Sequence, residues 1–300
     1  MIVNQSFANS KATLYLVATP IGNLADITFR AVEILKNVDY ILAEDTRVTG
    51  TLLFHYSIKT KMISYHKFNE KQKVQEVLNL LKKGKNLALV SDAGTPIICD
   101  PGYNLVKEIF ENGYNVVSIP GACAYINGLI CSGFDATDVH FLGFMPKKQG
   151  EIINTLKMHE NSKSTLIFYE SPKRIIKTFE GFTENLPAAN FCLCNDLTKK
   201  FEKIYRGSPD KILHELRENT SAEKGEYTIV IETETETNAD DFICEEKISL
   251  ESIIVDVMIK EKCTVKDAVK YIANDKTHDF GKNEVYTASL NLKKMFGRDT

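Results

Sequence analysis

The sequence has no long uninterrupted run of apolar residues. Its apolar stretches span about five to eight residues, whereas a helix that crosses a bilayer needs roughly twenty. The first residues, MIVNQSFANSKAT, also lack the charged start and apolar segment of a secretion signal. We therefore expect a protein without a membrane span that stays in the cytoplasm.

The cysteines lack the paired CxxC spacing of a structural zinc site. An odd number of thiols without that spacing favours small, buried apolar side chains in a reducing compartment. No metal is expected. The seven residues are Cys99, Cys123, Cys131, Cys192, Cys194, Cys244 and Cys263.

Neither of the common phosphate-binding glycine motifs occurs, because GxGxxG and GxxxxGK[ST] are both absent. The first predicted strand runs into VATPIGNLADIT (17–28), where Gly22 would let the backbone approach a ligand closely. Pro20, however, removes one N–H donor from that turn. A dinucleotide or a P-loop substrate is therefore a poor fit.

The charge is low overall and uneven along the chain. The net charge of −3 argues against non-specific coating of nucleic acid, which requires many basic residues. Residues 146–206 nevertheless carry a local excess of Lys and Arg, and so do residues 260–300. A patchy basic surface and ordinary solvated helix faces explain these counts about equally well.

Short β-rich runs alternate with amphipathic helices from residue 13 onward, which is typical of an α/β domain with largely parallel strands. Glycines at 84 and 113 stand where two helices must stop. The strands are expected at 13–18, 39–43, 62–66, 86–90 and 115–120, and the helices at 29–38, 51–56, 70–83 and 103–113.

A second α/β region with a mixed or antiparallel sheet follows a boundary near residue 140. Its predicted strands are HFLGFMP (140–146), 165–170, 190–198, 201–207 and 226–233, and its predicted helices are 171–186 and 208–219. Three short helices at the C-terminus suggest a helix-turn-helix interaction module or a bundle that packs on the main body. The expected domains are 1–140, 141–233, an acidic linker at 234–247 and a helical module at 248–300.

Four loops would meet at the carboxyl edge of the first sheet, where open α/β sheets bind ligands. They are TPIGN after the first strand, AEDTR (43–47), SDAGTPIICDPG (91–102) and PGACA (120–124). Small residues and few fixed charges suit a neutral or zwitterionic ligand with a flat ring. Taken singly, each loop could be simple turn chemistry.

These motifs, with FYESPKR and KGEYTIVIE, closely resemble the bacterial ribosomal RNA small subunit methyltransferase I family of the tetrapyrrole methylase superfamily. The resemblance covers about residues 12–233. It implies two α/β domains with a cleft for S-adenosylmethionine between them, and a small C-terminal helical module. It also implies a homodimer that methylates the ribose 2′-hydroxyl of a cytidine in the decoding region of 16S rRNA, within the 30S subunit.

The resemblance also assigns contacts to the methyl donor. Asn23 stands where relatives in the superfamily carry an Asp, which weakens any role for an acid there. The donor contacts carried over are Pro20, Asp92, Ala93, Gly94, Thr95, Ala122, Cys123, Ala124, Tyr169, Glu226 and Tyr227.

A ribose hydroxyl must lose its proton during or after methyl transfer, so a carboxylate could serve as general base. Glu170 and Asp100 are the candidates. Either could instead be structural, Glu170 as a helix cap and Asp100 in an Asx turn. Candidate RNA contacts are Arg47, Lys147, Lys148, Lys173 and Arg174, although Arg47 could pair internally with its acidic neighbours.

Two other functions remain compatible with the sequence. A C-methyltransferase acting on a tetrapyrrole precursor would carry similar donor loops, although the helical module and the basic stretches favour RNA. A non-catalytic ribosome-assembly protein could keep the fold without donor binding.

Overall fold

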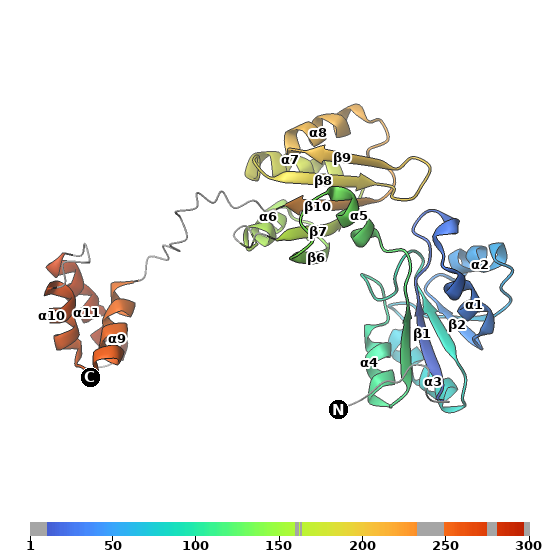
Figure 1. Cartoon of the computed structure of the whole chain (residues 1–300), viewed down its shortest axis with the longest axis horizontal. Coiled ribbons are helices and arrows are strands. Elements are labelled where there is room, and N and C mark those ends of the chain that lie inside the picture. The colour runs from blue at the N-terminus through green and yellow to red at the C-terminus, as the bar shows by residue number, and fades with distance from the viewer. Residues whose placement is uncertain (1–10, 160–161, 163, 233–248, 275–280, 297–300) are drawn as a thin grey trace. The chain divides into compact units, whose positions relative to one another are not determined.

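The computed structural model describes residues 11–159, 162, 164–232, 249–274 and 281–296 (Figure 1). The chain forms two compact units, Met1–Thr235 and Glu236–Thr300. The acidic linker expected at 234–247 lies outside the described residues.

The first sheet has five parallel strands in the order β3-β2-β4-β1-β5. All four residues of β4 are buried, as an apolar strand in the middle of a parallel sheet requires. The strands are β1 (Thr13–Val17), β2 (Tyr40–Ala43), β3 (Lys61–Ser64), β4 (Leu87–Val90) and β5 (Asn115–Ile119).

Helices cover both faces of this sheet (Figure 1). Helices α1 (Phe29–Asn37) and α2 (Thr46–His55) pack on one face, and α3 (Glu70–Lys82) and α4 (Tyr103–Glu111) pack on the other. Helix α2 begins five residues before its expected start at 51, because the Asp45 side chain accepts a hydrogen bond from the Arg47 N–H and caps it. A short 3₁₀ turn, η1 (Leu24–Asp26), precedes α1.

The second sheet is mixed, with the order β6-β7-β10-β8-β9. Strands β6 and β7 are parallel, whereas β10 pairs antiparallel with both β7 and β8. Strand β10 therefore lies at the centre of the sheet, although it is the last of the five strands in chain order. The strands are β6 (Val139–Phe144), β7 (Thr165–Glu170), β8 (Asn190–Asn195), β9 (Lys203–Gly207) and β10 (Tyr227–Glu232).

Three helices cover one face of the second sheet and one covers the other. Helices α6 (Gln149–Lys157), α7 (Ile175–Asn185) and α8 (Pro209–Glu218) share a core with Phe168 and Phe191. Helix α6 has no counterpart among the predicted elements. Helix α5 (Ala124–Ser132) covers the opposite face. The expected boundary at 140/141 falls inside β6, and α5 before it already packs on the second sheet, so that division stays a prediction.

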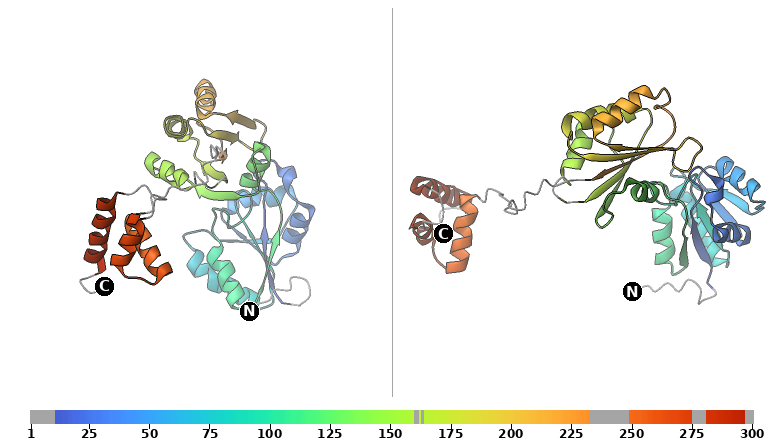
Figure 2. Two further views of the ribbon diagram at one scale, coloured as in Figure 1. Left: turned by 60° about the vertical axis from the view of Figure 1, so that its left-hand side comes forward. Right: turned by 45° about the horizontal axis from the view of Figure 1, so that its top comes forward.

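Among its described residues, 249–274 and 281–296, the C-terminal unit has three helices, as predicted (Figure 2). They are α9 (Leu250–Glu261), α10 (Val265–Asn274) and α11 (Lys282–Phe296). A core of Ile254, Val265, Ala268, Ile272, Val285, Ala288 and Leu292 holds them together. In the described part of the chain, no helix combines the length and apolar character that a membrane crossing needs.

Candidate active site

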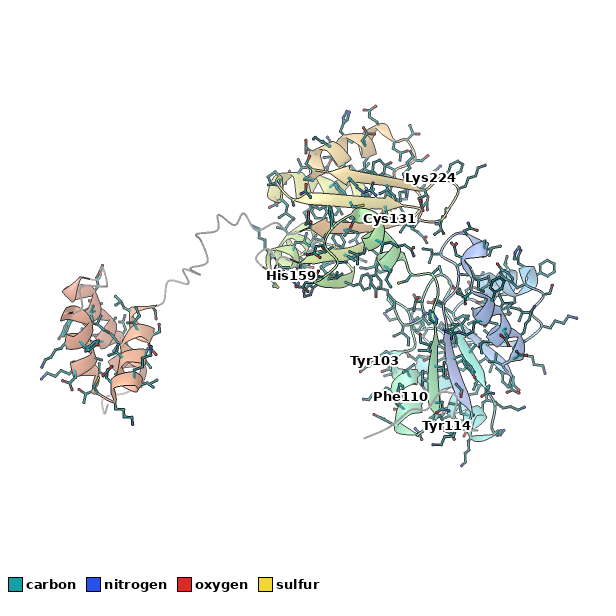
Figure 3. The ribbon with its side chains drawn as sticks, in the orientation of Figure 1. Tyr103, Phe110, Tyr114, Cys131, His159 and Lys224 are labelled. Carbon is teal, nitrogen blue, oxygen red and sulfur yellow. The ribbon has the colours of Figure 1, made fainter. Side chains whose placement is uncertain are left out.

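The loops that follow β1, β2, β4 and β5 are tied together at the carboxyl edge of the first sheet. Figure 3 shows Tyr103 at the end of α4 nearest this edge and Tyr114 beyond the other end of the helix. Thr19 and Gly94 form an antiparallel bridge, with N–H to carbonyl distances of 2.9 and 3.0 Å. The Asp45 N–H donates to Asp92 Oδ1 at 2.9 Å, so the loop after β4 holds those after β1 and β2.

The loop after β4 also binds the loop after β5 and has an unusual backbone. Thr95 Oγ1 donates to the Ala122 carbonyl at 3.0 Å. Ile97 and Cys99 have φ values of 76° and 66°, a region that β-branched and bulky side chains rarely occupy. Such strained backbone clusters at binding sites, where surrounding contacts maintain it.

A cavity of about 490 Å³ opens where these loops face the second sheet. That volume lies within the range of about 300–1,000 Å³ that is usual for small-molecule sites. The walls combine small and apolar groups with a few carboxylates. They come from Ile21, Glu44, Asp92, Ala93, Gly94, Thr95, Ile98, Cys99, Asp100, Cys123, Ala124, Phe144, Tyr169, Glu170, Ser171, Pro172, Glu226, Tyr227 and Thr228.

Most of the predicted donor contacts line this cavity. Those that do are Asp92, Ala93, Gly94, Thr95, Cys123, Ala124, Tyr169, Glu226 and Tyr227, whereas Pro20 and Ala122 are not among the lining residues.

Gly22 approaches protein rather than an open ligand site. A Cβ atom at Gly22 would collide with Lys199 Cγ and lie 3.0 Å from the Leu197 carbonyl. The Asn23 N–H also donates to Thr198 Oγ1 at 3.1 Å. The first loop is therefore joined to the turn between β8 and β9.

Of the five carboxylates that line the cavity, Glu44, Asp92 and Asp100 lie close enough to repel one another, and they make its inner part acidic. The pKa of Asp100 is raised to about 6, chiefly by burial; a hydrogen bond from Ser91 opposes the rise, and the nearby Asp92 carboxylate adds to it. Burial likewise raises the pKa of Glu44, with added repulsion from Asp100 and Asp92. Glu44 was not predicted as a site residue, although its position directly after β2 could have indicated it. This arrangement favours a cationic ligand group and disfavours a phosphate.

The Glu170 carboxylate is fully occupied by neighbouring groups. Its side chain has no exposed surface and pairs with Arg174 at 2.5 Å. Oε1 accepts from the Ser171 N–H at 2.6 Å, and Oε2 accepts from Thr178 Oγ1 at 2.8 Å. These contacts favour the structural alternative for Glu170 over the general base, and they leave Asp100 as the freer carboxylate.

An aromatic cluster forms the wall on the side of the second sheet. The Tyr169 ring lies 5.1 Å from the Phe141 ring and 5.4 Å from the Phe144 ring, both edge to face. The Tyr169 hydroxyl accepts from the Tyr125 N–H at 3.1 Å, which fixes the ring. Phe144 was also not predicted as a site residue. The face of the sheet on which it lies depends on a register shift between β6 and β7.

The side chains predicted to contact RNA differ in how strongly they are already bound to other groups of the protein. Arg47 is 89% exposed but pairs with Asp45, which lowers the pKa of that carboxyl, so internal pairing is the geometry observed. Lys148 and Lys173 form exposed ion pairs with Glu151 and Glu223, at 3.1 and 3.2 Å. Such surface pairs are weak and exchange readily.

Arg174 and Lys147 differ most in how available their side chains are for contact with RNA. Besides Glu170, the Arg174 guanidinium donates to the Pro146 carbonyl at 3.0 Å. It therefore anchors the chain after β6 and is the least available of the five. Lys147 is exposed.

Comparison with known proteins identifies the family. A sequence model of the tetrapyrrole (corrin/porphyrin) methylases matches residues 13–212. A protein named ribosomal RNA small subunit methyltransferase I from Halalkalibacterium halodurans is 40% identical over 268 residues, covering 89% of this chain and 92% of the relative. Its namesake from Escherichia coli O157:H7 is 38% identical over 288 residues, covering 96% and 98%.

Solved structures show the same fold at low identity. A diphthine synthase superposes with a TM-score of 0.59 at 12% identity, covering 75% of this chain and 91% of the other. A cobalt precorrin-4 methyltransferase gives 0.53 at 17%, covering 73% and 94%. The predicted α/β fold of tetrapyrrole-methylase type is thus confirmed. The chain belongs to the tetrapyrrole methylases and, among them, to the ribosomal RNA small subunit methyltransferase I family.

Proposed function

We propose that this protein transfers a methyl group from S-adenosylmethionine to the ribose 2′-hydroxyl of a cytidine in the decoding region of 16S rRNA. The observation that carries the proposal is the acidic cavity between the strand-end loops and β7 and β10, in a chain about 40% identical to ribosomal RNA methyltransferases. A homodimer acting in the cytoplasm on the 30S subunit belongs to the same proposal.

The residues of the cavity fit this donor in charge and in shape. S-adenosylmethionine carries a sulfonium and an ammonium cation, and Glu44, Asp92 and Asp100 supply negative charge there. The small side chains of Ala93 and Gly94 leave room for a flat ring against the backbone. The same carboxylates would repel a polyphosphate.

Bound in this cavity, the donor would supply an activated methyl group for an in-line displacement. The protein's main task is then to hold the ribose hydroxyl at near-attack distance, which accounts for several kcal/mol of catalysis. Asp100 is the better candidate for the proton acceptor, because its pKa of about 6 leaves it ionised at neutral pH yet basic enough to take a proton. Glu170 is the second candidate, although its three partners must first release it.

The test is incubation with methyl-labelled donor and, separately, naked 16S rRNA, assembled 30S subunits or a porphyrinoid precursor. We expect label on a cytidine ribose of the rRNA. Label on a base or on the porphyrinoid would contradict the proposal. Calorimetry that detects no donor binding would instead indicate a non-catalytic protein on the same fold.

A further inference from the structure

Strand β6 contains a bulge at the mouth of the cavity. Its pairing with β7 is regular from Val139 to Phe141, where Phe141 faces Ile167. Phe144 then faces Tyr169, so three residues on β6 span two on β7. Gly143 has a φ of 67°, the left-handed conformation that glycine commonly supplies at such bulges.

The bulge decides on which face of the sheet Phe144 lies. Side chains alternate along a strand, so regular pairing would place Phe144 with Leu142 on the face covered by α6, α7 and α8. The extra residue moves Phe144 to the face of Phe141 and Tyr169, and its ring contacts Tyr169 there. An aromatic side chain is thus turned from a core into the cavity.

The bulge is also packed against the strained loop of the first sheet. A Cβ atom at Gly143 would lie 3.4 Å from Cys99 Sγ, so the β6 backbone passes close to that thiol. This close approach holds the backbone that carries Phe144. The side chain itself remains 63% exposed at the rim of the cavity.

The surroundings of Phe144 suit one nucleotide of a single strand. Aromatic rings that stay exposed beside a site are the usual platforms for unpaired bases. Phosphates are repelled from the inner cavity by its carboxylates, whereas Lys147 and Lys148 lie exposed three and four residues beyond Phe144. A bound nucleotide would place its base on the Phe144 ring, its phosphate toward Lys147 and Lys148, and its ribose toward the cavity. Each part of the nucleotide would then meet a surface that suits its charge and polarity.

We propose that Phe144 is the platform on which the nucleobase of the methylated nucleotide stacks, positioned by the β6 bulge. This inference rests on the proposed function for its substrate. Stacking on the ring would present the ribose of that nucleotide, rather than its base edge, to the interior of the cavity. Because Phe144 lies at the rim of the cavity, it would act chiefly in RNA positioning, with a much smaller effect on donor binding.

The kinetic test compares Phe144→Ala, Phe144→Leu and Phe144→Tyr. We expect kcat/KM for 30S subunits to fall roughly tenfold to a hundredfold in the Ala and Leu variants, since one stacked base contributes that much. The Tyr variant should stay within about threefold of the parent, because it keeps the ring. Donor affinity measured by calorimetry should fall far less than kcat/KM in all three, because Phe144 lies at the rim of the cavity. A loss of donor affinity as large as the loss of kcat/KM, or full activity in the Leu variant, would overturn the proposal.

A direct test uses the absence of tryptophan from the sequence. Phe144→Trp introduces a single indole, whose fluorescence a stacked base quenches. We expect quenching by a short RNA copy of the target strand and none by S-adenosylmethionine alone. Phe54→Trp is the matched control, since Phe54 is 87% exposed on α2 and does not line the cavity.

The two measurements separate this inference from the proposed function. If the parent protein labels no rRNA, the proposed function fails, while quenching of the Phe144→Trp variant by RNA still supports the platform. If the parent labels rRNA but RNA quenches neither variant, or both equally, the platform is wrong.

Discussion

Asp100, which we propose as the proton acceptor, also affects the stability of the fold. Its pKa is raised from the ordinary value of 3.8 to about 6, so its ionised form is disfavoured in the folded protein. The free energy of unfolding should therefore fall as pH rises from about 4 to about 6, and stay low above that range.

Asp100→Asn should consequently stabilise the protein at pH 8 and abolish most methyl transfer. We expect a gain of about 1–2 kcal/mol at pH 8, after allowing for solvent around a partly exposed carboxyl, and no gain near pH 4. Urea unfolding at both pH values measures the gain. Equal gains at the two pH values would show that ionisation is not the cause.

Glu170 presents the opposite case, a carboxylate committed to structure. Glu170→Gln weakens the pair with Arg174 and should cost about 1–3 kcal/mol of unfolding free energy. Thr178→Val removes one hydrogen bond to the same carboxylate and should cost about 1 kcal/mol. Both proteins should keep methyl transfer within about tenfold of the parent while folded. A far larger loss of kcat in Glu170→Gln alone would identify Glu170 as the base.

At the scale of elements, α5 depends on close contact with β10. A Cβ atom at Gly128 would lie 2.8 Å from Thr228 Cγ2 and 3.6 Å from Val230 Cγ2. Gly128→Ala should therefore cost about 1–3 kcal/mol through overpacking. Thr228→Ser removes the Cγ2 methyl group with which the new Cβ atom would collide. The double variant should therefore recover most of the lost unfolding free energy. Additive effects in a double-mutant cycle would show that the strain lies elsewhere.

The sequence predicts most elements because their signals are local. NLALV indicates a buried parallel strand without any knowledge of its neighbours, and the glycine- and proline-rich loops mark the strand ends. The start of α2 could also have been predicted, since Asp45 is a good helix cap. The position of the Phe144 side chain could not, because the bulge is defined by the pairing register between β6 and β7. Likewise, the partners of Glu170 become visible only once α7 lies beside β7.

At the scale of the whole chain, the cavity belongs to the first compact unit alone. Its lining residues run from Ile21 to Thr228, and the C-terminal helices have a separate core. A chain ending at Thr235 should therefore bind S-adenosylmethionine with a dissociation constant within about twofold of the full chain, since linked domains with separate cores fold independently. Calorimetry on both proteins checks this. A much weaker constant would mean that the helical unit supports the site.

The central place of β10 has a consequence for synthesis. Until this last strand leaves the ribosome, β7 and β8 each present an unpaired apolar edge, and the cavity lacks Glu226, Tyr227 and Thr228. Unpaired edges are templates for aggregation. A nascent chain stalled before Tyr227 should therefore depend on chaperones. It would also lack part of the cavity in which we propose that the methyl donor binds and stabilises the finished protein.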